Sequence, residues 1–151
     1  MSIQKILVPY DFSQHSEHAL NWAIGLAEKW QARLELLHVI HILPPVVDIA
    51  GDVYEHVEQA QLAATQKHLE TILSAKAESS SVILGSHVRR GVPFQAICDE
   101  AATQQADLIV MGSHGRTGLS HVFIGSVAER VIRHASCPVL VTKLPEKLTP
   151  S

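Results

Sequence analysis

Five short apolar runs recur along this 151-residue chain, and the segments between them have the periodicity of helices. In these runs Ile, Val and Leu occupy both odd and even positions, so both faces of each strand would be apolar. This is typical of strands buried between two layers of helices. They cover Ile3–Val8, Leu34–Ile40, Val82–Leu84, Leu108–Met111 and Val139–Val141.

Helical patterns separate these runs. Apolar residues recur at helical spacing over Ala19–Trp30, Phe94–Ala102 and Val127–Ala135, and Pro93 suits a first helical position. Val53–Ala77 also predicts a helix, although its apolar stripe is less regular. Strict alternation of strand and helix predicts an α/β fold with a parallel sheet and helices on both faces.

The length favours one doubly wound domain, which we expect to span residues 1–144. The polar, proline-containing segment 145–151 is expected to be a frayed tail. The first residues, MSIQKILVPYDFS, turn polar too quickly for a signal peptide and are typical of a first strand.

Charge and composition argue against several classes of protein. The net charge is −3 and no run of Lys and Arg occurs, so we expect neither a nucleic-acid partner nor binding to an anionic membrane. No segment approaches the about 18 apolar residues of a membrane span, so no membrane insertion is expected. Cys98 and Cys137 are too few for a disulfide scaffold and lack metal-ligand spacing, which favours a cytoplasmic protein with reduced thiols.

Two loops are candidates for a ligand site, because ligands of doubly wound sheets bind at the carboxyl ends of strands. One is Pro9–Ser13, after the first run, and the other is Gly112–Arg116, after the fourth. If the first and fourth strands are neighbours, the two loops face each other across one crevice.

The second loop begins a glycine pattern suited to phosphate. Gly112 is followed after two residues by Gly115, and after nine more by Gly125 and Ser126. Glycines let backbone N–H groups approach an anion, a helix beginning here would add its free N–H groups, and Arg116 would add positive charge. Equally, glycines after a strand are often only turns, and the four residues from Ser126 have a capping-box pattern.

This segment resembles the nucleotide-binding motif of the universal stress proteins, in the branch that binds ATP. That motif is Gly, two residues, Gly, nine residues, Gly and then Ser or Thr, and the chain matches every fixed position. KILVPYDFS, LELLHVI, ADLIVMGSHGRTGL and GSVAERVIRHASCPVLV are similar to other family segments. The resemblance implies a five-stranded, mostly parallel sheet of strand order 3-2-1-4-5.

The resemblance also implies the ligand and its contacts. The expected cofactor is ATP, or ADP or AMP, with magnesium held through the phosphates. Adenosine would contact Pro9, Tyr10, Asp11, Phe12, Ser13 and Val39, with Met111 lining the pocket. The ribose and phosphates would contact Gly112, Ser113, His114, Gly115, Arg116, Gly125, Ser126 and Val127.

Two of these residues have open alternatives. Asp11 could cap the following helix together with Ser13, a role compatible with ligand binding. Phe12 stands where many members have a smaller residue, so its ring would either crowd the pocket or pack over it.

Other candidates have plainer interpretations. His15 with His18, and His38 with His41, lack the carboxylates or cysteines that would complete a transition-metal site. Arg89 and Arg90 are expected in a solvated turn after the third strand, and Cys137 is expected to pack rather than react.

The last strand is predicted to be an edge, and the family implies a homodimer in which these edges meet through Val139, Leu140, Val141 and Thr142. The function predicted is a nucleotide-dependent homodimeric switch in stress adaptation, with an unidentified protein partner. The alternatives are a slow ATPase, for which no general base is evident, and a nucleotide-free dimeric interaction protein.

Overall fold

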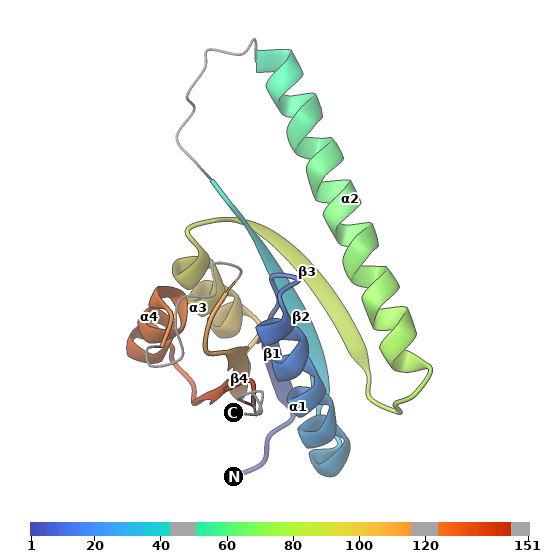
Figure 1. Cartoon of the computed structure of the whole chain (residues 1–151), viewed down its shortest axis with the longest axis vertical. Helices are drawn as coiled ribbons and strands as arrows, with labels where there is room; N and C mark the ends of the chain where they lie inside the picture. Colours follow the sequence, from blue (N-terminus) through green and yellow to red (C-terminus); the bar gives the residue numbers. More distant parts are fainter. Residues whose placement is uncertain (43–50, 116–123, 146–151) are drawn as a thin grey trace, which may run out of the picture.

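Every strand pairing in the computed structural model is parallel, and the strand order is β3-β2-β1-β4-β5. The model describes residues 1–42, 51–115 and 124–145. The strands are β1 (Lys5–Pro9), β2 (Arg33–His41), β3 (Leu84–Gly91), β4 (Leu108–Gly112) and β5 (Val139–Thr142). The helices are α1 (Gln14–Trp30), α2 (Gly51–Ala77), α3 (Pro93–Thr103) and α4 (Ser126–His134). The predicted α/β class and strand order are confirmed. Pro9, Gly112 and Thr142 are the last residues of their strands. Figure 1 shows how the helices are arranged around the sheet.

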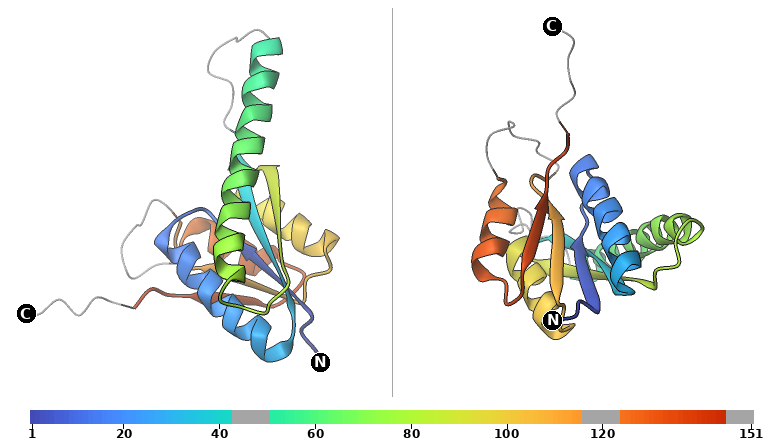
Figure 2. Two further views of the ribbon diagram at one scale, coloured as in Figure 1. Left: turned by 90° about the vertical axis from the view of Figure 1, so that its right-hand side faces the viewer. Right: turned by 90° about the horizontal axis from the view of Figure 1, so that it is seen from below.

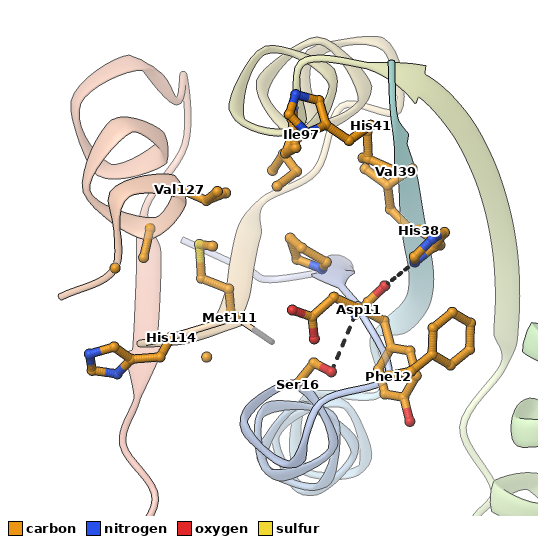
Figure 3. A pocket seen from close by; sticks show the side chains of 18 of the residues that line it. Asp11, Phe12, Ser16, His38, Val39, His41, Ile97, Met111, His114 and Val127 are labelled. Carbon is orange, nitrogen blue, oxygen red and sulfur yellow. Dashed lines mark hydrogen bonds between the residues drawn. The ribbon is translucent and has the colours of Figure 1, made fainter. Parts of the chain in front are cut away.

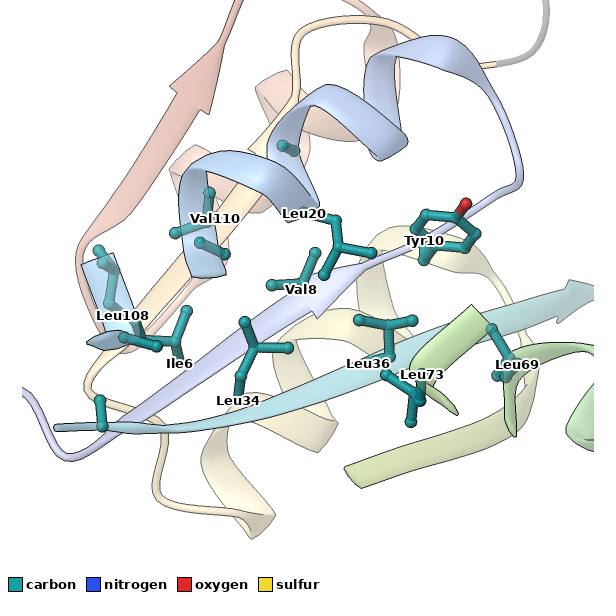
Figure 4. Close-up of a cluster of buried hydrophobic side chains, with 14 residues drawn as sticks. Ile6, Val8, Tyr10, Leu20, Leu34, Leu36, Leu69, Leu73, Leu108 and Val110 are labelled. Atoms are coloured by element: carbon teal, nitrogen blue, oxygen red, sulfur yellow. The ribbon is translucent and has the colours of Figure 1, made fainter. Parts of the chain in front are cut away.

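Helices cover both faces of the sheet, with α1 and α2 on one side and α3 and α4 on the other (Figure 2). Ile6 and Val8 of β1 point into the cluster beneath α1 and α2, whereas Leu7 between them points into the cluster beneath α3 and α4. Because successive side chains enter clusters on opposite faces of the sheet, both the odd and the even positions of the strand are apolar. Figure 4 shows the first cluster, in which Leu20 of α1 lies beside Val8 of β1.

Helix α2 is long, and only part of it packs on the sheet. Its 27 residues correspond to a rod of about 40 Å. Of these residues only Leu69 and Leu73 are buried, and the amino-terminal half extends past the sheet (Figure 1). The irregular apolar stripe of this segment follows from that partial packing.

The third strand differs most from its prediction. The apolar run Val82–Leu84 only touches its start, and the strand continues through polar residues to Gly91. Arg89 and Arg90 therefore lie in β3, and the predicted solvated turn is wrong. Arg89 pairs with Glu100 of α3 at 2.8 Å, and Arg90 pairs with Glu58 of α2 at 2.6 Å. Because ion pairs to the helices on both faces hold this part of β3, its sequence lacks the apolar pattern by which a strand is predicted.

A buried carboxylate lies between β2 and β3. Glu35 is 3% exposed and contacts Arg33 on its own strand, while its Oε2 lies 3.1 Å from Nε2 of His87 on β3. Gly85 is directly opposite Glu35 in the parallel register. A Cβ at Gly85 would lie 2.2 Å from Oε2 of Glu35, so a larger residue here would displace the carboxylate from its partners.

We therefore expect Gly85→Ala to destabilise the protein by about 1–3 kcal/mol, because the overpacked carboxylate loses its partners or displaces β3. The matched control is Gly25→Ala in α1, where an added Cβ meets nothing within 4 Å. Alanine should stabilise that helix by about 0.5–1 kcal/mol. Urea unfolding of the two variants measures both effects, and equal shifts of the two midpoints would contradict this explanation.

Candidate functional site

A cavity of about 800 Å³ opens at the carboxyl ends of β1, β2 and β4. Chain connections run in opposite directions from β1 and β4, which makes this edge the switch point where doubly wound sheets bind ligands. The volume is that of a small-molecule site. Figure 3 shows Asp11, Met111, Val127 and Ile97 around this space.

The loop after β1 is held by its own hydrogen bonds. The Asp11 N–H donates to Oγ of Ser16 at 3.3 Å, and the Ser13 N–H donates to Oδ1 of Asp11 at 3.0 Å. Ser13 is the N-cap of α1, and its Oγ accepts from the Ser16 N–H at 3.2 Å. Ser13 is therefore the cap, whereas Asp11 does not cap α1 itself: it accepts from the N–H of the cap residue and lines the cavity.

Phe12 packs beside the pocket instead of filling it. Its φ of 65° is in the left-handed region, which non-glycine residues rarely adopt. The ring stacks on His68 of α2, with centroids 4.4 Å apart and planes 11° apart, and meets Tyr10 edge-on. In Figure 3 the ring lies on the far side of Asp11 from Met111 and His114. Stacking against α2 holds the turn that presents Asp11.

Polar contacts fix the two ends of Tyr10. Nδ1 of His38 lies 2.7 Å from the Tyr10 carbonyl oxygen, and a carbonyl only accepts, so this nitrogen is the donor. The Tyr10 hydroxyl donates to Oε2 of Glu17 at 2.8 Å. Burial, helped by this bond to Glu17, raises the pKa of Tyr10 far above its ordinary value, so the hydroxyl remains a donor.

The loop after β4 begins against α1. A Cβ at Gly112 would lie 2.9 Å from the backbone of His15, so glycine permits the close approach of β4 to the helix start. The Ser113 N–H continues the sheet by donating to the Thr142 carbonyl at 2.9 Å. The Ser113 carbonyl then accepts from the Gly125 N–H at 2.7 Å, which ties the strand end to the start of α4.

The two predicted loops meet at Gly115 and Asp11. A Cβ on Gly115 would stand 3.0 Å from Oδ2 of Asp11, so the glycine backbone and the carboxylate are near neighbours across the crevice. The loops were expected to face each other if β1 and β4 are neighbours. The two strands do pair, with Ile6 opposite Leu108.

Helix α4 presents its amino terminus to the cavity. Gly125 is the N-cap, with φ −61° and ψ 156°, and Ser126, Val127 and Ala128 line the cavity. The first N–H groups of a helix have no carbonyl partner within it and favour an anion. The predicted capping box is wrong by one residue, because Ser126 is already helical and Gly125 adopts the extended cap conformation.

Nearly all of the predicted ligand contacts border this one cavity. Those that line it are Pro9, Tyr10, Asp11, Phe12, Val39, Met111, Gly112, Ser113, His114, Gly115, Gly125, Ser126 and Val127. Ser13 does not line it and acts as the cap of α1. Arg116 lies outside the described residues.

Sequence reasoning missed several lining residues. They include Ser16, Leu37, His38, Ile40, His41, Gln61, Thr65, Pro93, Ile97, Ile124 and Ala128. Those on β2 flank Val39 and could have been inferred from their strand end. Gln61 and Thr65 had no local signal, because only the packing of α2 on β3 brings them to the cavity.

Two histidines adjoin the phosphate side. The rings of His15 and His114 are 5.3 Å apart, and Nδ1 of His114 lies 2.9 Å from Oγ of Ser113. Burial first, and then the neighbouring His114, lowers the pKa of His15. His15 is therefore neutral near neutral pH.

The two cysteines do not line this cavity. Burial raises the pKa of the Cys98 and Cys137 thiols, and both side chains pack against the apolar cluster beneath α3 and α4. Within the part of the chain that the structure describes, no group of at least three His, Cys, Asp or Glu side chains could hold a metal ion. Nor does any described helix have the length and apolarity to cross a membrane.

Comparison with known proteins identifies the family. The model of the Universal stress protein family matches residues 2–143. The chain belongs to the universal stress protein family. Universal stress protein MJ0531 of Methanocaldococcus jannaschii is 38% identical to it over 144 residues, which are 95% of this chain and 84% of that protein.

Solved structures of other universal stress proteins have the same fold. The structure of MJ0577, a Methanocaldococcus jannaschii protein, is 30% identical and superposes with a TM-score of 0.80, covering 97% of this chain and 100% of that one. UspA from Lactobacillus plantarum is 28% identical with a TM-score of 0.81, covering 93% of this chain and 98% of that one.

The cap assignment predicts a contrast between two serines of this universal stress protein. Ser13→Ala removes the acceptor of the Ser16 N–H and should cost about 1 kcal/mol of unfolding free energy. Ser126→Ala leaves the Gly125 cap intact and should change stability by less than about 0.5 kcal/mol. Urea unfolding of both variants is the measurement, and a larger loss at Ser126 would overturn the assignment.

Glu17 should make the free energy of unfolding depend on pH in the acid range. Burial alone would raise the pKa of Glu17, but hydrogen bonds from Lys76 and Tyr10 outweigh burial and lower it below its ordinary 4.5. The native state therefore favours the ionised form, and its contribution is present above pH 4.5 and disappears as pH falls through the lowered pKa.

The variant Glu17→Gln should consequently be less stable than the wild type at pH 7, and the difference should close in acid. Unfolding midpoints measured from pH 7 to pH 3 test this, with Glu55→Gln on the exposed part of α2 as the control. A difference that stays constant over this pH range would show that Glu17 does not act through its charge.

Proposed function

We propose that this universal stress protein binds an adenine nucleotide in the cavity between the β1 and β4 loops and acts as a nucleotide-dependent homodimeric switch in stress adaptation. The observation that carries the proposal is the approach of Gly115 to Asp11. It joins a carboxylate suited to a nucleoside and a glycine backbone suited to phosphate in one cavity of about 800 Å³.

The adenosine half has apolar walls and a fixed acceptor. Val39 of β2, Met111 of β4 and Ile97 of α3 supply apolar surface for a purine ring. Asp11, held in place by Ser13 and Ser16, offers carboxylate oxygens to the amino group of adenine or the hydroxyls of ribose.

The phosphate half is built from backbone. Gly112, Gly115 and Gly125 line this half of the cavity, and the first N–H groups of α4, with the positive end of the helix dipole, face the same space. His114 and the predicted contact Arg116 would add donors. Magnesium would be held mainly by the phosphates, a mode that requires few protein ligands.

Two other solved proteins of this fold are described with nucleotides. One is a universal stress protein in complex with cAMP, and the other is an Arabidopsis thaliana family protein with AMP bound; each is 22% identical to this chain. These likenesses establish the fold, and the nucleotides belong to those proteins. They make an adenine nucleotide the natural first ligand to test here.

The homodimer would form at the edge strand β5, through Val139, Leu140, Val141 and Thr142. Ser113, which begins the glycine loop, donates to the Thr142 carbonyl at the end of this strand. A nucleotide that binds the loop would therefore act on the dimer edge through one hydrogen bond, and would shift the population toward the state that it binds better. The protein partner that reads this state, and the cytoplasm as compartment, are further parts of the proposal.

Calorimetry with ATP and magnesium should give saturable binding to the wild type. Competition by ADP, AMP and GTP then compares the affinities of these nucleotides with that of ATP. Gly115→Val should weaken ATP binding about tenfold or more, because its side chain enters the gap to Asp11.

The matched control is Gly51→Val at the start of α2, where a Cβ meets nothing within 4 Å. It should bind ATP as the wild type does. Absence of binding to the wild type at millimolar nucleotide would overturn the proposal, and so would equal affinity of the Gly115→Val variant.

A further inference from the structure

Strand β5 ends the sheet with an uncovered residue on the α1 side. Leu140 pairs with Val110, which faces the cluster beneath α1, so Leu140 points to the same side. Its neighbours Val139 and Val141 pack against the opposite cluster, beneath α3 and α4. Leu140 is 37% exposed, and no described strand pairs with the outer edge of β5.

The flanks of α1 are distinguishable by their contacts. Glu17 and Asn21 accept hydrogen bonds from Lys76, so that flank faces α2. Trp22 follows Glu17 by five residues, which places it about 140° around the helix. It therefore lies on the flank directed toward β5, with 53% of its surface exposed.

We propose that Trp22 and Leu140 form the apolar centre of a contact with a second copy of this chain. The inference rests on the homodimer of the proposed function and adds α1 to an interface otherwise made by β5. Exposed tryptophan beside an unpaired strand edge is the kind of surface that an identical partner covers.

Symmetry determines what each α1 would face. A two-fold axis perpendicular to the sheet pairs the β5 strands antiparallel and leaves corresponding helices on the same face. The Trp22 flank of one α1 then faces the Trp22 flank of the other, across the paired Leu140 side chains.

Distances explain why a large side chain is needed. Helix α1 packs mainly over β1 and β4. Strands lie about 4.8 Å apart, so the two α1 helices of such a dimer would stand roughly 15–20 Å apart. Directly packed helices are about 8–10 Å apart, which leaves a trough above the joined β5 strands. Two indole rings above two leucines would fill this trough.

Sedimentation across a dilution series gives the dissociation constant of the dimer. Trp22→Ala should raise it about tenfold or more. Ile83→Ala is the control, because Ile83 is 65% exposed beside β3 at the opposite edge of the sheet. That variant should dissociate as the wild type does. An unchanged constant for Trp22→Ala, or a wild type that is monomeric throughout, overturns the inference.

Tryptophan fluorescence tests the contact independently, in a variant that keeps both Trp22 and Leu140. The chain has two tryptophans, so Trp30→Phe leaves Trp22 as the single reporter. Its emission should shift to shorter wavelength as concentration rises through the dimer transition, and an unshifted emission contradicts burial of Trp22. Trp22 is outside the nucleotide cavity, so calorimetry of Trp22→Ala with ATP should match the wild type. Failure of the nucleotide proposal is thus separable from failure of this one.

Discussion

The close approach of the β4 end to the start of α1 determines the rest of the site. Gly112 abuts the backbone of His15, and any larger residue there would push β4 away from the helix. This contact brings the following glycine, Gly115, next to Asp11. The hydrogen bond from Gly125 to the Ser113 carbonyl then directs the start of α4 at the same space. Two loops almost a hundred residues apart thereby form one cavity.

The order of elements and the ligand loops could be predicted from sequence because they depend on local patterns. Apolar runs of both parities identified β1, β2 and β4, whose side chains are buried on both faces. Glycines after a strand identified the loop at Gly112. The same reasoning misplaced β3, because an edge strand held by Arg89 and Arg90 ion pairs carries little apolar signal.

Other features depend on packing between distant segments. The stack of Phe12 on His68 joins the first loop to α2, and neither residue indicates the other in sequence. Gln61 and Thr65 reach the cavity only because α2 packs on β3. The N-cap of α4 is Gly125 because its backbone is extended there, a choice that residue type alone assigned to Ser126. Local pattern thus predicts the elements, and tertiary contact decides which side chains share the site.

The measurement that tests the central claim most directly is a crystal structure of the protein grown with ATP and magnesium. We expect adenine between Val39 and Met111 with Asp11 at its polar edge, and phosphates against Gly115 and the first N–H groups of α4. A nucleotide bound elsewhere on the molecule, or phosphates directed away from the glycine loop, would contradict it.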